Sequence, residues 1–292
     1  MYAINKESLK SFTPNAESVC RIPDNSTNLY LRDDRLVEKF LKDIEPKYNS
    51  AVAKILANDI DSECIYVISG FVAYVLACSP ASMRLHSEPV KYTVEETARM
   101  FDSKGVFPLL PPELAGKDLN ELLEDGDLRF EIDPKYPQSM GICSILSQVM
   151  MFGNSKWDIL MNPFNDNTFF TSDFPVPIEM FDDFRIFNRI IPLTPELAIR
   201  IIPVKSIDRK SADFSFSNFR QTVRKLKLRD AMYINELIVR CAETTVFFRD
   251  DYEWIPKFVK KNAGFRIESR TIRIPNGDGT LHFTSLLFAR SS

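Results

Sequence analysis

The sequence predicts an α+β fold: a mostly helical N-terminal half packed on a mainly antiparallel sheet with inserted helices. Three observations lead to this prediction. Up to about residue 153, apolar residues recur at three- and four-residue spacing, as they do on one face of a helix. From residue 156 on, short β-branched and aromatic segments alternate with turn-forming residues. Near the end, the turn formers Asn276 to Gly279 separate two segments that alternate like the arms of a β-hairpin.

The chain has 292 residues, enough to bury a full core without disulfides. Residues 1–32 are rich in Ser, Asn and Pro, and we expect them to form an extended arm. We expect residues 33–292 to form a single α+β domain, because no linker-like composition interrupts the chain near residue 153. Its helical part would cover residues 33–153 and its sheet part residues 154–292.

The first predicted helix follows Asp33-Asp34, which would cap it, and carries one apolar stripe as far as Leu56. The next covers Ser62–Cys78 and ends before Pro80. Its apolar run is shorter than the roughly 20 residues that span a bilayer, which predicts a buried core helix and no membrane segment. Thr93 to Glu96 fits a capping box, so a third helix is expected to begin near Val94. Shorter helices are predicted at 113–125 and 138–152.

In the second half, segments 156–161 and 168–171 flank a turn and predict one hairpin, and 185–192 and 197–204 predict a second strand pair. Thr171 would therefore end a strand buried beside the strand of Trp157. Helices are predicted at 215–228, 230–248 and Trp254–Asn262. We expect the strands of 156–204 and of the final hairpin, residues 265–290, to share one sheet.

The cysteines and histidines limit the chemistry. The five cysteines are odd in number and well separated, which is typical of reduced thiols in a cytoplasmic protein rather than of disulfides or a zinc site. With only two histidines, a His-based metal centre is nearly excluded. No metal ligand is therefore assigned from the sequence, although a divalent cation held by carboxylates is one candidate cofactor.

Charge is distributed unevenly. Residues 1–196 carry a formal net charge of −11 and residues 197–292 one of +8. Arg220, Arg224 and Lys227 recur at the spacing of one helix face within the predicted helix 215–228. One interpretation is a basic face that binds nucleic acid or a nucleotide through phosphate. The other is that these residues pair with the acidic half of the chain. A protein partner is a further alternative.

Thr171-Ser172-Asp173 ends an apolar segment and is followed by prolines at 175 and 177. Asp and Ser side chains accept hydrogen bonds from nearby backbone N–H groups, so the segment has a structural interpretation, and we expect Asp173 to accept at least one such bond. In the catalytic interpretation Asp173 acts as a base or metal ligand, with Ser172 as a polar contact. A metal-dependent hydrolase needs a further carboxylate, for which Glu45 is the candidate.

This region also resembles a known family. The segment KWDILMNPFNDNTFFTSDFPV resembles the bacterial domain-of-unknown-function family four-two-three-eight, whose members have a Trp-bearing strand, an Asn and then a Phe-x-Thr-Ser-Asp-x-Pro segment. IPLTPELAI, the helix with Asn235 and the helix with Glu45 are similar to further parts of the family, over about residues 35–250. The family usually has a His before its Tyr-Leu segment, and a family helix often ends with Arg-Thr-Pro and is followed by a later Arg. This chain has no such His, has Cys78-Ser79-Pro80 at the second place and keeps only Arg84 nearby.

Two function classes follow. The first is a hydrolase acting on nucleic acid or a nucleotide. The alternative is a non-catalytic binding or scaffold protein that keeps the family fold without its His and Arg. The candidate catalytic residues are Asp173, Glu45 and Ser172, and the candidate substrate-binding residues are Arg84, Thr171, Asn162, Asn235, Arg220, Arg224 and Lys227.

Overall fold

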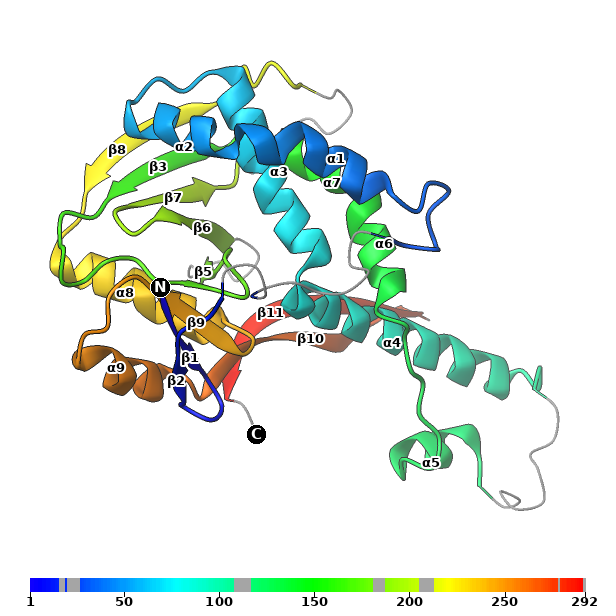
Figure 1. The fold of residues 1–292 in the computed structure, drawn as a ribbon. Coiled ribbons are helices and arrows are strands. Elements are labelled where there is room, and N and C mark those ends of the chain that lie inside the picture. The colour runs from blue at the N-terminus through cyan, green and yellow to red at the C-terminus, as the bar shows by residue number, and fades with distance from the viewer. Residues whose placement is uncertain are drawn as a thin grey trace.

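The computed structural model describes residues 1–15, 19, 27–107, 117–180, 187–204, 213–277 and 279–290. The fold is α+β, as predicted. Figure 1 shows a central sheet with α1 to α3, α6 and α7 on one side and α8 on the other. A second, smaller sheet lies near the N-terminus, and a long hairpin runs beneath α4 (Figure 1).

The first predicted helix is broken into three pieces: α1 (Leu36–Ile44), the 3₁₀ turn η1 (Glu45–Lys47) and α2 (Tyr48–Leu56). The prediction of one continuous helix is wrong because of Pro46, which stands inside the apolar stripe. Proline has no N–H to donate and its ring collides with the preceding turn, so the α-helix stops and resumes. Glu45 is therefore in the turn and exposed, not on a helix face.

The core of the helical layer is α3 (Ser62–Cys78), which is buried along most of its length, as expected. Asp61 caps its N-terminus by accepting a 2.8 Å hydrogen bond from the N–H of Cys64. Around α3 pack α6 (Lys135–Cys143) and α7 (Ile145–Gly153), which split the single helix predicted at 138–152. The short α5 (Leu119–Glu124) begins with a capping box.

After Ser79, the chain continues directly into α4 (Pro80–Ser103), so the predicted start near Val94 is wrong. The hydroxyl of Thr93 donates to the carbonyl of Pro89, one turn back, and this bond takes the place of an N-cap. Among the described helices, none is by itself long and apolar enough to cross a membrane, whereas α3 and α4 together, bent by 57° at their junction, meet that length and composition.

The central sheet has the strand order β5-β6-β7-β3-β8. Its strands are β3 (Lys156–Met161), β5 (Ile178–Met180), β6 (Phe187–Thr194), β7 (Leu197–Ile202) and β8 (Arg220–Lys225). All neighbours are antiparallel except β3 and β8. Side chains alternate between the faces of a strand. Trp157 and Ile159 of β3 accordingly enter the core around α3, and Leu160 packs with α8 (Leu228–Cys241).

Two helix predictions in this half are wrong. Residues 220–225 form β8 rather than part of a helix at 215–228, because β3 offers a partner along its whole length. The helix predicted at 230–248 ends at Cys241, and β9 (Thr245–Phe248) follows. The helix α9 (Trp254–Asn262) has the predicted bounds.

The small sheet has the order β2-β1-β9-β4, with β1 (Tyr2–Asn5), β2 (Ser11–Phe12) and β4 (Thr171–Ser172). Residues 2–5, expected in the extended arm, thus pair along β9. The hairpin predicted for residues 156–171 is wrong, because Thr171 pairs with Phe247 of β9 and not with the strand of Trp157.

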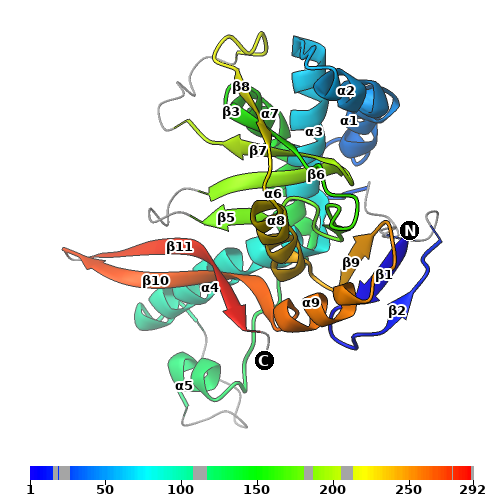
Figure 2. The same cartoon turned by 90° about the vertical axis from the view of Figure 1, so that its left-hand side faces the viewer.

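The last two strands, β10 (Phe265–Asn276) and β11 (Gly279–Arg290), form the predicted hairpin. They form a two-stranded sheet of their own, so the expectation that they share the sheet of β3 is wrong. The hairpin packs against α4 instead (Figure 2).

Candidate functional site

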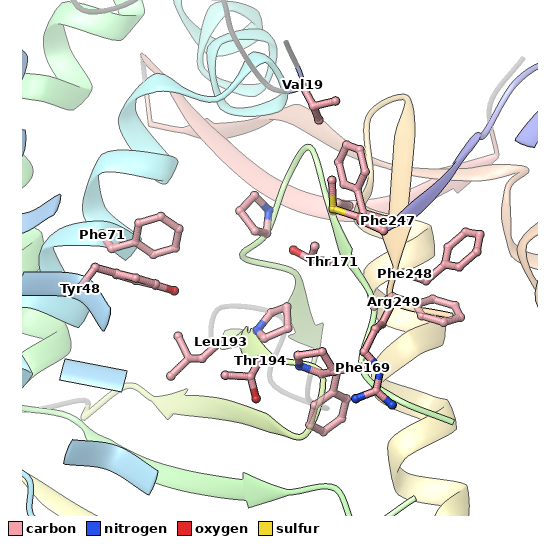
Figure 3. Close-up of a pocket in the computed structure, with 16 residues that line it drawn as sticks. Val19, Tyr48, Phe71, Phe169, Thr171, Leu193, Thr194, Phe247, Phe248 and Arg249 are labelled. Atoms are coloured by element: carbon pink, nitrogen blue, oxygen red, sulfur yellow. The ribbon is translucent and has the colours of Figure 1, made fainter. Parts of the chain in front are cut away.

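Thr171 and Ser172 line a pocket of about 540 Å³ between the small sheet, the β6–β7 turn and the helical layer. Tyr48 of α2 and Phe71 of α3 close its opposite side (Figure 3). Pro175, which follows the Thr-Ser-Asp segment, and the turn residues Pro192 to Pro195 also line it. Elements from both halves of the chain therefore build this one cavity.

The pocket is lined mainly by aromatic and aliphatic side chains, among them Phe169, Phe247, Phe248 and Leu193. A cavity of this size with few polar groups is typical of sites for small apolar ligands. The β4–β9 pairing brings these side chains together, because it places Phe247 opposite Thr171. The small sheet therefore supplies one wall of the pocket.

Two hydroxyl groups face the interior of the pocket. Those of Tyr48 and Thr171 both point toward the space between α2 and β4 in Figure 3. Burial raises the pKa of Tyr48 to about 12, so its phenol is neutral at physiological pH and can donate and accept hydrogen bonds. Within the described part of the chain, neither hydroxyl has a hydrogen-bond partner. Both are available to a ligand.

Arg249 is the only basic side chain among the described residues that line the pocket. Its guanidinium bonds to the carboxylate of Glu196 and lies 2.6 Å from Asp250. Its charge is thus already compensated at the rim of the pocket.

Ser172 has its hydroxyl engaged locally. Its Oγ donates to the carbonyl of Phe174 at 2.9 Å and accepts from the N–H of the same residue at 3.2 Å. The side chain is buried, and its proton is already donated. This arrangement shapes the turn after β4 and differs from that of an activated nucleophile, which must be paired with a base.

Asp173 accepts four hydrogen bonds from the turn between α8 and β9. Oδ1 accepts from the N–H of Glu243 at 2.9 Å, and Oδ2 accepts from the N–H groups of Thr244 and Thr245 at 2.7 and 3.0 Å. The Thr244 hydroxyl adds a further bond to Oδ2 at 2.7 Å. The prediction that Asp173 accepts a backbone N–H bond is confirmed.

The same turn joins Asp173 to Arg84. The carboxylate of Glu243 accepts hydrogen bonds from Nε and Nη2 of Arg84 at 2.7 and 2.8 Å. Nη1 of Arg84 donates to Glu268 of β10 at 2.7 Å. Such forked pairs are geometrically specific. Arg84 and Asp173 are therefore brought together through Glu243, and we refer to Asp173, Glu243, Arg84 and Glu268 as the polar chain.

Lys6, the residue after β1, lies beside the polar chain and is not among the residues that the sequence predicts for the site. Its side chain is buried and its Nζ donates to the carbonyls of Ala242 and Phe265 at 2.6 and 2.5 Å. Burial lowers the pKa of Lys6 to about 8, an effect opposed by the nearby Cys241, Asp173 and Glu243. The residues around Lys6 in the sequence give no local signal that its side chain is buried.

The remaining predicted residues lie elsewhere. Glu45 is exposed on η1 and does not line the pocket. Asn162 donates to the carbonyl of Asn167 and accepts from the N–H of Phe164. Asn235, fully buried on α8, accepts from the N–H of Phe170 at 2.9 Å and donates to the carbonyl of Thr168 at the same distance. Both asparagines fix the chain that leads into β4.

The basic set is not on one helix. Arg220 and Arg224 belong to β8, and Lys227 is the N-cap residue of α8. Nη1 of Arg220 donates to the carbonyls of Ser217 and Phe219, and Nε of Arg224 lies 3.1 Å from a carboxylate oxygen of Asp158. None of the three lines the pocket at Thr171.

In the described ranges, no three His, Cys, Asp or Glu side chains are placed so that they could hold a metal ion. No curated protein and no solved structure matches the chain. The model of one family does match, over residues 1–252, and that family is described as "Protein of unknown function (DUF4238)". The match includes β1, the Thr-Ser-Asp segment and every described residue that lines the pocket. The chain therefore belongs to the DUF4238 family, the one that its Trp strand and Phe-x-Thr-Ser-Asp-x-Pro segment resemble.

Proposed function

We propose that this protein is a binding protein whose pocket takes a small, uncharged, mostly apolar molecule that carries a hydroxyl or carbonyl group. The observation that carries the proposal is the convergence of aromatic side chains with the hydroxyls of Tyr48 and Thr171, which have no hydrogen-bond partner among the described residues. Aromatic walls favour an apolar ligand body, and two fixed polar groups orient it.

A binding role agrees with the contacts of Asp173, Arg84 and Ser172, whose polar groups already bond to other parts of the protein. Asp173 and Arg84 have their charges taken up in the polar chain, and the Ser172 hydroxyl is donated to a backbone carbonyl. A general base or nucleophile needs hydrogen-bond reach to its substrate. The other candidate, a hydrolase acting on nucleic acid or a nucleotide, uses Glu45 and Asp173 for acid–base or metal chemistry, and Arg84 and the basic residues at 220–227 for phosphate binding. None of these residues lines this pocket.

The proposal includes two further expectations, one on how the chain folds and one on where the protein acts. The helical N-terminal part and the sheets fold as one unit, since the pocket and the polar chain take residues from both. Release of a stable fragment ending near residue 153 in limited proteolysis would contradict this. The protein acts in the cytoplasm, as expected from its odd number of well-separated cysteines.

The proposal is tested with N-phenyl-1-naphthylamine, an uncharged fluorescent probe whose emission rises in an apolar cavity. We expect the wild-type protein to bind it and Leu193→Trp to lose binding, because the larger side chain fills the pocket beside Tyr48.

The matched control is Leu146→Trp, the same substitution at an exposed position of α7 outside the pocket. It should bind the probe like the wild type, and both variants should keep the wild-type melting temperature. Equal probe binding by Leu193→Trp and the wild type would exclude this pocket as the site.

A further inference from the structure

A row of polar residues crosses the central sheet, one from each strand. It lies on the face where Leu160, two residues from Asp158, packs with α8. Glu179 of β5 lies opposite Asn188 of β6, and Arg200 of β7 lies opposite Asp158 of β3. Arg224 of β8 is two residues beyond Thr222, the neighbour of Asp158. The row lies on one face because paired residues, and residues two apart, point to the same side.

The inner members of the row contact one another, and all of them except the partly exposed Arg200 are buried. Arg200 Nη2 donates to Glu179 Oε1 at 3.0 Å, and the Nδ2 of Asn188 donates to Glu179 Oε2 at 2.7 Å. Asp158 has a side chain that is 2% exposed, and its Oδ2 is 3.1 Å from Nε of Arg224. A carboxylate buried to this degree is stable only with compensating partners.

Two oxygen atoms in the row have no hydrogen-bond donor among the described residues: Oδ1 of Asp158 and Oδ1 of Asn188. Lys156 Nζ lies 3.4 Å from the first without hydrogen-bond geometry. The orientation of the Asn188 amide is set by chemistry, because only its nitrogen can donate to Glu179. An unsatisfied buried acceptor costs free energy, so each oxygen calls for a donor.

Both residues line a cavity of about 420 Å³, together with Glu179, Arg200, Arg224 and Tyr233 of α8. Arg224 differs from the inner members because its side chain is 50% exposed and its strand is the outer edge of the sheet. Its guanidinium can therefore swing out into solvent, which leaves Lys156 and Arg200 as the charged neighbours of Asp158. The aromatic ring of Tyr233 offers a face of the kind on which planar cations stack.

We propose that this cavity binds a small molecule through a guanidinium group, which donates to Asp158 and Asn188 and takes the place that Arg224 occupies. The two free oxygens are acceptors, so the ligand must supply N–H donors to them. Arg200 Nε also has no hydrogen bond of good geometry among the described residues, but it lies 2.9 Å from Glu179 Oε2, which compensates its charge. With Arg224 withdrawn, the lining residues Asp158, Glu179 and Arg200 carry a net negative charge, which favours a cation over a phosphate. The planar fork of a guanidinium matches a carboxylate beside an amide oxygen.

The test uses methylguanidinium as the probe and saturation-transfer difference NMR of its methyl group as the measurement. The wild-type protein should bind it weakly, since Arg224 competes for Asp158. The Arg224→Ala variant should bind it about tenfold more tightly, because the competitor is removed. The Arg220→Ala variant removes an arginine of the same strand whose bonds go to backbone carbonyls, and it should bind like the wild type.

A ligand control separates donors from charge. Tetramethylammonium carries the same charge and has methyl groups for detection but no N–H, so it should not bind. Three outcomes would overturn the proposal: no binding of methylguanidinium to the wild type, an equal gain in Arg220→Ala, or equal binding of tetramethylammonium. The first would mean that water alone satisfies the two oxygens. Arg224→Ala removes one partner of the buried Asp158, so a melting curve of each variant first shows that it is folded.

Discussion

Asp173 Oδ2 accepts hydrogen bonds from both the N–H and the hydroxyl of Thr244, each at 2.7 Å, across 71 residues of sequence. The bonds tie the end of β4 to the turn before β9, and β4–β9 pairing forms the wall of the aromatic pocket. A carboxylate is suited to this role because it offers several acceptor sites to converging backbone donors. The Thr-Ser-Asp segment therefore contributes to the pocket by holding β4 beside β9.

Asp173→Asn should destabilise the protein by roughly 2–4 kcal/mol, because an amide loses the charge and turns an N–H₂ group toward backbone donors. Chemical denaturation measures the change in the free energy of unfolding. The control is Asp166→Asn, at an exposed carboxylate in the turn that precedes β4, which should change stability by less than about 0.5 kcal/mol. Equal effects of the two substitutions would show that the four bonds to Asp173 contribute nothing.

Arg84 and Glu243 should be energetically coupled. Their side chains are 24% and 18% exposed, and the contact is a two-bond fork. A double-mutant cycle with Arg84→Met and Glu243→Gln should give a coupling energy of about 1–2 kcal/mol. The exposed pair Lys39 and Asp33 serves as the comparison and should give less than about 0.5 kcal/mol. A coupling for Arg84 no larger than that of the surface pair would contradict the role of the polar chain.

Lys6 should titrate with a pKa near 8, far below the usual 10.5, because it is buried. Below that pH both the folded and the unfolded chain hold the proton, and the folded chain bears the cost of a buried charge. As the pH rises from about 8 to about 10.5, the folded chain has released the proton and the unfolded chain still holds it, so the contribution of Lys6 to stability increases. Direct ¹³C NMR of labelled lysines reports the titration, and a Lys6 signal that moves together with those of surface lysines would contradict the prediction.

The sequence predicted those elements whose signals are local. The strand Lys156–Met161 and the helix Trp254–Asn262 have their predicted bounds, because hydrophobic pattern and flanking turn residues lie within the segments themselves. The helix prediction for residues 220–225 was wrong because a spacing of four places Arg220 and Arg224 on one side of a helix and also on one side of a strand. The pairing with β3 decides between helix and strand for these residues, and this pairing cannot be predicted from neighbouring residues in the sequence.

For the candidate site, the Thr-Ser-Asp segment and the bonding of Asp173 could be predicted, since turn chemistry depends on neighbouring residues. The partner of β4 could not, because β9 is more than 70 residues away. Tyr48 read as an ordinary member of an apolar stripe, and its place in the pocket follows from the break at Pro46 and the packing of α2. Asp158 is a carboxylate inside an otherwise apolar strand, a pattern that indicates a buried charge with a partner, here Arg224.

The central claim is that the pocket binds an apolar body and that Tyr48 and Thr171 hold its polar group. The most direct measurement compares the dissociation constants of 1-naphthol and naphthalene for the wild type and the double variant Tyr48→Phe/Thr171→Val, which removes only the two hydroxyls. We predict that 1-naphthol binds the variant about tenfold more weakly, the effect of losing roughly 1.4 kcal/mol of hydrogen bonding, and that naphthalene binds both proteins equally. Absence of binding by either compound, or equal 1-naphthol affinity in both proteins, would contradict the account.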